Sequence, residues 1–127
     1  MLLLEDVVKT AVHRHLEEKG YTSVSSKLGT RQGYDVEGVD PETGVRLVVE
    51  CKGEAGTGSQ HARSWGNVAS ALLTSVNEVG DANGNRVAIA PPDTPAYRER
   101  SRFLKGLLDR EGITMFWVSS DLAVTEW

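Results

Sequence analysis

The sequence predicts a single α/β domain in which helices flank a mixed central β-sheet, and three observations indicate this fold class. An amphipathic segment at residues 3–19 precedes several short apolar runs that are separated by turn residues. The turn at residues 40–44, Asp-Pro-Glu-Thr-Gly, joins two of these runs as an antiparallel hairpin. A long helical segment at residues 60–79 then leads to another run at 86–90, and a strand reached through a helix is expected to pair in parallel.

The first element is expected to be a helix over residues 3–19. Its inward side chains recur on one face: Val8, Ala11, Val12 and Leu16. Gly20 follows, at the position where helices commonly end in the left-handed conformation. Glu5 lies in phase with the apolar stripe, so its side chain is expected to point inward or along the seam with the sheet. Residues 21–28 are expected to form the first strand.

Two strands, residues 34–39 and 45–52, flank the turn and are expected to pair through a four-residue loop. This pairing sets Asp35 directly opposite Glu50, and directly opposed residues share a face of the sheet. Lys52 lies two residues beyond Glu50, so the pleat returns it to the same face. The other face carries the side chains expected in the core: Tyr34, Val36, Leu47, Val49 and Cys51. A slip of one residue would bury the charges, so the apolar pattern supports this register.

Two neighbouring carboxylates and a lysine on one sheet face favour the chemistry of a divalent metal. A divalent cation relieves the repulsion between Asp35 and Glu50, and its hard character suits oxygen ligands. Mg²⁺ usually takes one or two carboxylates together with waters and substrate phosphate oxygens. A lysine at Lys52 can orient or deprotonate the attacking water, or neutralise negative charge that develops on the phosphate. The pattern therefore predicts phosphodiester hydrolysis; the alternative is a surface hairpin with an ordinary cross-strand charge cluster.

Asp35, Glu50 and Lys52 resemble the active site of the PD-(D/E)xK, or restriction-endonuclease-like, nuclease superfamily. The Glu-x-Lys triplet ends an apolar strand, and an acid stands at the matching position one hairpin earlier. The similarity extends to about Ala90, and Tyr34 stands where the motif name has proline. The resemblance implies a restriction-endonuclease-like mixed sheet flanked by helices. Its core would have the order α-β-β-β-α-β, to which this chain adds a C-terminal helix and strand.

The resemblance also implies how the site works. Asp35 and Glu50 would hold Mg²⁺ or Mn²⁺, joined by the main-chain carbonyl of Cys51, and Lys52 would act on the attacking water. In this superfamily the first helix often donates a glutamate toward the metal, which makes Glu5 a further candidate ligand. The alternative for Glu5 is that it favours the positive N-terminus of its own helix.

A glycine-rich segment at residues 53–59 follows the site. It is either a plain connector or a loop whose main chain approaches a DNA phosphate before Ser59 caps the next helix. Related nucleases often place a polar residue at the start of that helix, so Ser59, Gln60 and Arg63 are candidate DNA-binding residues. The segment has neither the Gly-Lys-Ser/Thr ending nor the Gly-x-Gly-x-x-Gly spacing of nucleotide-binding loops, which argues against that class.

The remaining elements are expected to pack around this hairpin. The helix at residues 60–79 has a packing stripe of Val68, Ala71, Leu72, Ser75 and Val76, and Trp65 is expected in the core or an interface. The last elements are a strand at 86–90, a helix from Pro95 to about residue 110, a strand at 113–118 and an edge strand at 122–127. Asp93 or Thr94 is expected to cap the helix that Pro95 opens.

Composition agrees with a small enzyme domain spanning residues 1–127. The chain is 39% hydrophobic and 25% charged, and no segment approaches the roughly 18 apolar residues of a membrane span. One cysteine cannot form an internal disulfide, and the three histidines lack zinc-ligand spacing. With no secretory signal at its start, the protein is expected in the cytoplasm, with no membrane partner. The net charge of −4 opposes DNA binding, so basic patches, bound metal or dimerisation must offset it.

The function predicted from these observations is that of a metal-dependent DNA endonuclease. The chain has little room for a target-recognition domain, so it is expected to act as a small nuclease, for example a homodimer, or as the cutting subunit of a restriction, repair or recombination complex. The alternative is a catalytically silent nuclease-fold module that binds DNA or a partner protein. The Asp35, Glu50 and Lys52 set argues against this alternative, and the acidic net charge favours it.

Overall fold

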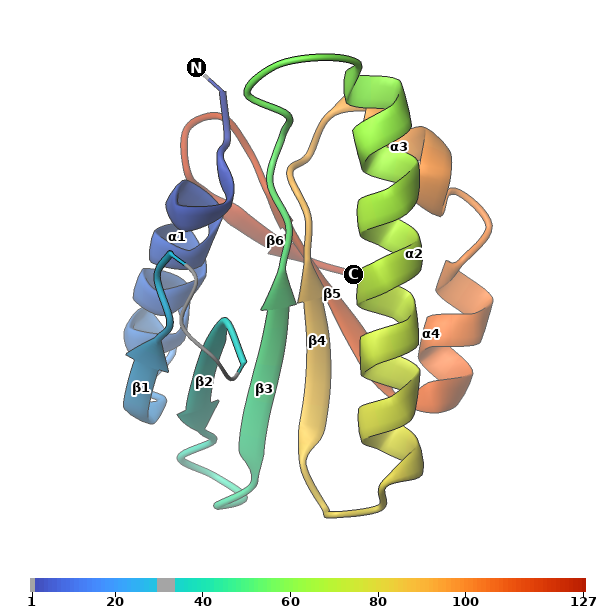
Figure 1. The fold of residues 1–127 in the computed structure, drawn as a ribbon. Coiled ribbons are helices and arrows are strands. Elements are labelled where there is room, and N and C mark those ends of the chain that lie inside the picture. The colour runs from blue at the N-terminus through green and yellow to red at the C-terminus, as the bar shows by residue number, and fades with distance from the viewer. Residues whose placement is uncertain (1, 30–33) are drawn as a thin grey trace.

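The fold is a six-stranded mixed sheet with helices on both faces, in a computed structural model that describes residues 2–29 and 34–127 (Figure 1). The elements follow the order α1 (Glu5–Glu18), β1 (Thr22–Ser26), β2 (Val36–Val39), β3 (Arg46–Cys51), α2 (Gln60–Gly80), β4 (Arg86–Ala90), α3 (Pro95–Ser101), α4 (Lys105–Glu111), β5 (Ile113–Val118) and β6 (Val124–Glu126). The strands lie in sequence order; β3, β4 and β5 are mutually parallel and the other neighbours antiparallel. The predicted mixed sheet with flanking helices is confirmed.

The hairpin between β2 and β3 has the predicted register. Val36 pairs with Val49 and Val39 with Arg46, a register that, continued by one residue, sets Asp35 opposite Glu50. Two main-chain bonds close the turn, from the N–H of Asp40 to the Val45 carbonyl and from Gly44 to Asp40, both at 2.9 Å. Gly44 has φ of +71°, a conformation that glycine adopts without steric cost. Turn chemistry and apolar alternation therefore select the same pairing.

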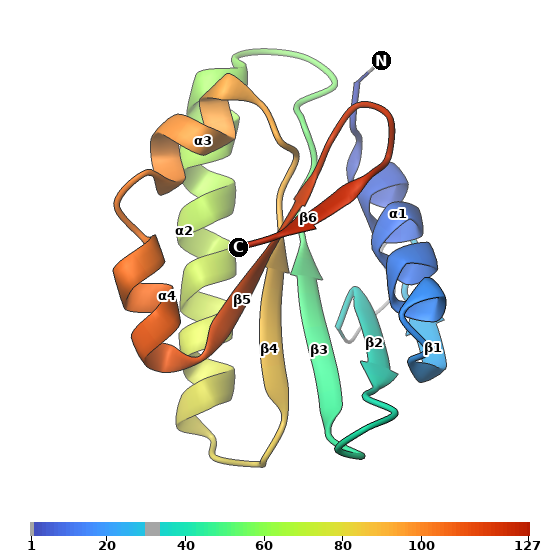
Figure 2. The ribbon, with the colours of Figure 1, turned by 180° about the vertical axis from the view of Figure 1, so that it is seen from behind.

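Helices cover both faces of the sheet, as Figures 1 and 2 show, and a hydrophobic core lies on each face. On one face, α1 packs Val8, Val12 and Leu16 against strand residues that include Val49 and Phe116. On the other face, α2, α3 and α4 cover a cluster that includes Val48, Ile89, Met115 and Trp117. Because both faces are covered, polar groups reach solvent mainly at the ends of the strands, and this is where the candidate site lies.

Tyr34 lies on the opposite face from the one predicted. It packs against the core beneath α2, and its hydroxyl donates to the carboxylate of Glu78 in that helix. The prediction was wrong because Tyr34 precedes β2 and the chain bends at Asp35, so strand alternation does not extend to it. Burial, and then the bond to Glu78, raises the pKa of Tyr34 to about 12, so the hydroxyl remains a donor at neutral pH.

Helix α2 presents small side chains to the sheet, which corrects part of its predicted stripe. Ser64, Ala71 and Ser75 are its buried residues, and their size permits a close approach of helix and sheet. Val68 and Leu72 of the predicted stripe are partly buried and pack against this core, whereas Val76 is exposed, and Trp65, at 64% exposure, is not a core residue.

The helix predicted from Pro95 to about residue 110 is divided into α3 and α4. Thr94 caps α3 through a side-chain bond from the Tyr97 N–H at 3.4 Å, one of the two predicted caps. The helix ends at Ser101, and α4 begins at Lys105. The break lets Tyr97 of α3 and Leu108 of α4 both reach the core beneath α2.

The remaining boundaries differ from prediction by a few residues. β1 is shorter than residues 21–28, and a register shift lies between Thr22 and Ser25, where Ser23 has φ of +52°. The edge strand β6 is shorter than residues 122–127. Among the described residues, no helix has both the length and the apolar character to cross a bilayer.

The C-terminal hairpin is fastened to α1 by an ion-pair cluster around Glu126. Its carboxylate accepts from the Lys19 ammonium and lies 3.4 Å from His15 Nε2. Burial works to raise the pKa of Glu126, but Lys19 and then His15 outweigh it, so the pKa is lowered. A lowered pKa means that Glu126 stabilises the fold above its unfolded-state pKa and that this stability is lost as the pH falls through the folded-state value.

Glu126→Gln is expected to reduce the free energy of unfolding by about 0.5–1 kcal/mol at neutral pH, since the pair is partly exposed to solvent. The difference from the unmodified protein should shrink as the pH falls through the folded-state pKa of Glu126 and vanish once this carboxyl group is protonated in both the folded and the unfolded protein. Urea unfolding at neutral pH and across this acidic range measures the change. A difference of the same size at every pH would mean that Glu126 acts through packing and not through its charge.

Candidate functional site

Glu50 and Lys52 lie at the carboxyl end of β3, on the side of the molecule where α1 and α2 begin (Figure 1). The Lys52 ammonium is 3.4 Å from Glu50 Oε1, and the two side chains are 15% and 20% exposed. The Lys52 N–H donates to the Ala90 carbonyl at 3.0 Å, so β4 holds the main chain of this segment. Both groups are therefore held by the sheet and still open to solvent.

Asp35 reaches the same end of β3 from the neighbouring chain segment. Its Oδ2 accepts from the Cys51 N–H at 2.7 Å, and its Oδ1 lies 3.4 Å from the Lys9 ammonium. The Cys51 side chain is fully buried in the core beneath α1, so only its main chain is available to the site. The structure thus brings Asp35 to the main chain that joins Glu50 to Lys52.

Both carboxylates are incompletely neutralised. Burial raises the pKa of Asp35, and the Cys51 N–H and the Lys9 charge only partly oppose this. Burial also raises the pKa of Glu50, the negative charge of Asp35 raises it further, and Lys52 opposes both effects. An additional cation between or beside these carboxylates would relieve their repulsion.

Lys9 is a member of the site that the sequence analysis did not identify. Its side chain is 1% exposed and its ammonium lies close to Glu5, Asp6 and Asp35. Burial works to lower the pKa of Lys9, but Asp35 and then Glu5 outweigh it, so the pKa is raised and the group stays charged. The sequence shows only that Lys9 lies one helical turn after Glu5, which is the spacing of an ordinary ion pair on a helix, and not that it reaches Asp35.

Two further residues missed from the sequence hold the segment after Lys52. The Tyr97 hydroxyl donates to the Gly53 carbonyl at 2.6 Å. Asn67 donates to the same carbonyl at 3.3 Å and to the Tyr97 oxygen at 2.8 Å. On the other side, the Glu54 N–H donates to the Leu3 carbonyl at 2.8 Å. No local pattern identifies these partners, since they come from α2, α3 and the N-terminus.

The three candidate DNA-binding residues have different surroundings. The Ser59 hydroxyl caps α2 by accepting from the Ala62 N–H at 3.2 Å, as predicted. The Gln60 amide accepts from the N–H of Ala55 and donates to its carbonyl, both at 2.8 Å, so it braces the loop. Arg63 is exposed and makes no ion pair within the described part of the chain. Of the three, Arg63 has the side chain most available to a phosphate.

The donor set fits a metal that also takes ligands from the substrate. Within residues 2–29 and 34–127, no group of three His, Cys, Asp or Glu side chains is arranged to hold a metal. Glu5, the predicted third carboxylate, faces the Lys9 ammonium at 3.3 Å. Asp35 and Glu50 remain, and two carboxylates with phosphate oxygens and waters are what Mg²⁺ commonly uses.

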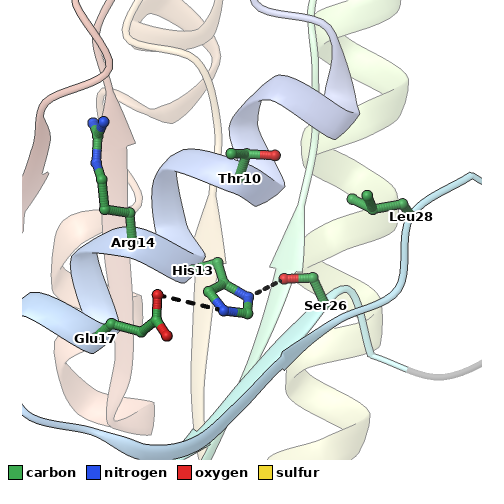
Figure 3. A pocket seen from close by; sticks show the side chains of 6 residues that line it. All are labelled: Thr10, His13, Arg14, Glu17, Ser26 and Leu28. Atoms are coloured by element: carbon green, nitrogen blue, oxygen red, sulfur yellow. Dashed lines mark hydrogen bonds and ion pairs between the residues drawn. The ribbon is translucent and has the colours of Figure 1, made fainter.

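A separate hollow of about 440 Å³ lies between α1 and β1 and contains none of these residues (Figure 3). Its wall carries His13, whose Nδ1 lies 2.6 Å from the Ser26 hydroxyl. The Glu17 carboxylate is 3.6 Å from the other ring nitrogen, beyond hydrogen-bond length, and is 60% exposed. The bond between His13 and Ser26 therefore connects α1 to the edge strand β1, and Glu17 lies on the other side of the ring.

The fold is similar to that of two solved structures. One is an XisH family protein from Nostoc punctiforme, with 18% sequence identity, a TM-score of 0.62 and coverage of 96% of this chain and 98% of that chain. The other is an fdxN element excision controlling factor protein from Anabaena variabilis, with 17% identity, the same TM-score and the same coverage. No family model and no curated protein matches the chain.

The likeness covers nearly the whole of each chain, so the entire α/β arrangement is shared and not a fragment of it. At this level of identity the likeness shows the fold alone, because one fold supports many functions. An assignment of activity therefore has to rest on the side chains at the end of β3.

Proposed function

We propose that this protein is a metal-dependent DNA endonuclease of the PD-(D/E)xK type. The observation that supports the proposal is the convergence of Asp35, Glu50 and Lys52 at the end of β3, with both carboxylates incompletely neutralised. Asp35 and Glu50 would hold Mg²⁺ or Mn²⁺, together with the main-chain carbonyl of Cys51. The bound metal would activate water and stabilise negative charge on the phosphate.

The protein's own groups would position the reactants. The Cys51 N–H fixes the Asp35 carboxylate, and the strand end holds Glu50 and Lys52 on a rigid support. The Lys52 ammonium, 3.4 Å from Glu50, would orient the attacking water or donate a hydrogen bond to a phosphate oxygen. Arg63 and the N-terminus of α2 lie after the glycine-rich loop and would contact the DNA backbone.

DNA is the proposed substrate class. The Anabaena protein is named as a controlling factor for excision of the fdxN element, and a role for a protein of the same fold in DNA rearrangement or repair is consistent with the site proposed here. The net charge of −4 limits the electrostatic contribution that one chain makes to DNA binding. A partner in a larger nuclease complex would supply the missing positive charge, whereas a second copy, with the same net charge of −4, would contribute only through a local basic patch.

A second candidate function is a silent module that binds DNA or a partner protein without cleaving DNA. The observation that favours it is the position of Lys9, whose ammonium already neutralises part of the acidic cluster at Asp35 and Glu5. A protein of this kind would not require a divalent metal to bind its partner.

Digestion of linear, nicked, single-stranded and four-way-junction DNA, with Mg²⁺, Mn²⁺ or a chelator, distinguishes the two functions. Asp35→Asn is expected to lower the cleavage rate by about 10²-fold or more, because it removes a carboxylate charge that the metal requires. The matched control is Asp109→Asn, which removes an exposed carboxylate of α4 and should cleave normally. Cleavage that persists in Asp35→Asn or in chelator would contradict the proposal, and metal-independent DNA binding without cleavage would favour the silent module.

A further inference from the structure

The Lys9 ammonium lies at the centre of four oxygen atoms. The Lys27 carbonyl oxygen is 2.7 Å away, Glu5 Oε2 3.3 Å, Asp35 Oδ1 3.4 Å and Asp6 Oδ1 3.5 Å. The lysine side chain is 1% exposed, whereas Glu5 and Asp6 are 44% and 55% exposed. The nitrogen is therefore enclosed by its ligands, two of which reach solvent, and Asp6 Oδ1 also accepts from the Gly29 N–H at 3.2 Å.

This arrangement has the composition of a cation site. An ammonium donates three hydrogen bonds and carries one positive charge, yet it faces three carboxylates and a carbonyl. Carboxylate and carbonyl oxygens are also the ligands of Ca²⁺, Mg²⁺ and Mn²⁺, at about 2.0–2.6 Å. The oxygens stand farther from the nitrogen than this, so the cluster is arranged around an ammonium and not around a metal.

We infer that Lys9 is the resident cation of the acidic cluster formed by Glu5, Asp6 and Asp35, and that it confines metal binding to Asp35 and Glu50. The inference rests on the proposed function, because it concerns which carboxylates remain for the metal. Lys9 is a positioning residue: it holds Asp35 from the side of α1 while the Cys51 N–H holds it from β3. Because the Glu5 carboxylate pairs with the Lys9 ammonium, it does not serve as a metal ligand.

Removing the ammonium should convert the cluster into a divalent-cation site. Lys9→Met keeps most of the buried stem but leaves three carboxylates without their counter-ion. The variant is expected to unfold at a lower temperature without divalent cation and to regain stability when Mn²⁺, Mg²⁺ or Ca²⁺ is added. Its affinity for Mn²⁺, measured by calorimetry, should exceed that of the unmodified protein by about tenfold or more, since a positive charge at this distance repels a cation strongly.

Two variants control this experiment. Lys105→Met removes a lysine that pairs with Asp109 on the exposed surface of α4, and its response to cations should equal that of the unmodified protein. Lys9→Met combined with Glu5→Gln removes one carboxylate together with the ammonium. The double variant should be more stable than Lys9→Met without cation and should lose most of the additional response to Mn²⁺. Sodium chloride at matched ionic strength excludes general screening.

Each outcome decides the inference. A Lys9→Met protein that divalent cations do not stabilise beyond the unmodified protein overturns it, and so does an unfolded Lys9→Met protein that none of the three cations refolds. Digestion of DNA in parallel separates this result from the proposed function. An unmodified protein that cleaves DNA while Lys9→Met lacks a cation response leaves the nuclease standing and removes the role of Lys9. If the unmodified protein does not cleave DNA but divalent cations stabilise Lys9→Met, the nuclease proposal fails and Lys9 remains the resident cation of the cluster.

Discussion

Replacing Lys52 with methionine is expected to lower the rate of metal-dependent DNA cleavage by a factor of about 10²–10⁴ while the protein remains folded. The ammonium is 3.4 Å from Glu50 at a partly open strand end, so it can reach a water or a phosphate oxygen. Methionine preserves the apolar stem. The Lys52 N–H, which donates to the Ala90 carbonyl, is unaffected by the substitution.

The loss of cleavage rate in Lys52→Met can have two causes: the loss of a proton-transfer group or the loss of a positive charge near the phosphate. The Lys52→Arg variant distinguishes them. Arginine keeps the positive charge but does not give up its proton in proteins. Activity near that of the unmodified protein would indicate charge neutralisation, whereas activity near that of Lys52→Met would indicate proton transfer or a geometry that only lysine provides. The rate should be measured at saturating metal, because removing the ammonium also changes the charge beside Glu50.

Lys105→Met is the matched control, since it removes an exposed lysine from α4 and should leave cleavage unchanged. Circular dichroism and urea unfolding of Lys52→Met establish that the fold is retained. Cleavage by Lys52→Met at the rate of the unmodified protein would remove Lys52 from the proposed mechanism.

The hairpin that carries the site was predictable because two independent local signals agree. The Pro-Glu-Thr-Gly turn defines the loop, and the alternation of Val36, Leu47 and Val49 defines which face is buried. Together they leave one register, and that register sets Asp35 opposite Glu50. The parallel strand β4 was predictable for a similar reason, since a helix separates it from β3.

The supports of the site were not predictable, because they depend on tertiary packing. Tyr97 and Asn67 meet at Gly53 only because α2 and α3 lie side by side on one face of the sheet. Lys9 appears on a helical wheel as an ordinary partner of Glu5, and only its position against Asp35 makes it a member of the site. Local patterns thus identified the candidate site residues, and long-range contacts determine their surroundings.

The side chain of Glu5 illustrates the same limit. From the sequence, Glu5 is either a metal ligand or a charge at the helix N-terminus, and both alternatives depend on the direction of its side chain. In the structure, Glu5 begins α1 and faces the Lys9 ammonium, so the same residue lies at the helix N-terminus and belongs to the acidic cluster. The sequence pattern does not show that Lys9, one helical turn after Glu5, is buried, and this burial determines what Glu5 contacts.

Substitution of Gly53 by alanine is expected to have the largest effect on stability, at about 3 kcal/mol or more of the free energy of unfolding. A Cβ atom at this position would lie 2.3 Å from the Glu5 nitrogen, 2.7 Å from the Leu4 carbonyl carbon and 2.8 Å from the Glu5 Cα. These are main-chain atoms at the start of α1, so no side-chain rotation removes the clash.

Neither partner in this contact can move at low cost. Tyr97 and Asn67 hold the Gly53 carbonyl, and the next residue, Glu54, bonds to Leu3. The helix would have to shift instead, and α1 carries both Glu5 and Lys9 against Asp35. Because a displacement of about 1 Å at a reacting group can cost 10²-fold in rate, Gly53→Ala is also expected to lose most of its cleavage activity.

Gly56→Ala is the matched control from the same loop. A Cβ atom at Gly56 would meet only Leu4 Cδ2, at 4.0 Å, which is the movable end of an exposed side chain. Its effect on unfolding should stay within about 0.5 kcal/mol, since added contact is slight and the unfolded chain loses some freedom. Urea unfolding of both variants measures the difference. Equal stability of Gly53→Ala and Gly56→Ala would mean that α1 can slide along the end of β3, and Lys9 and Glu5 would then not be held rigidly against Asp35.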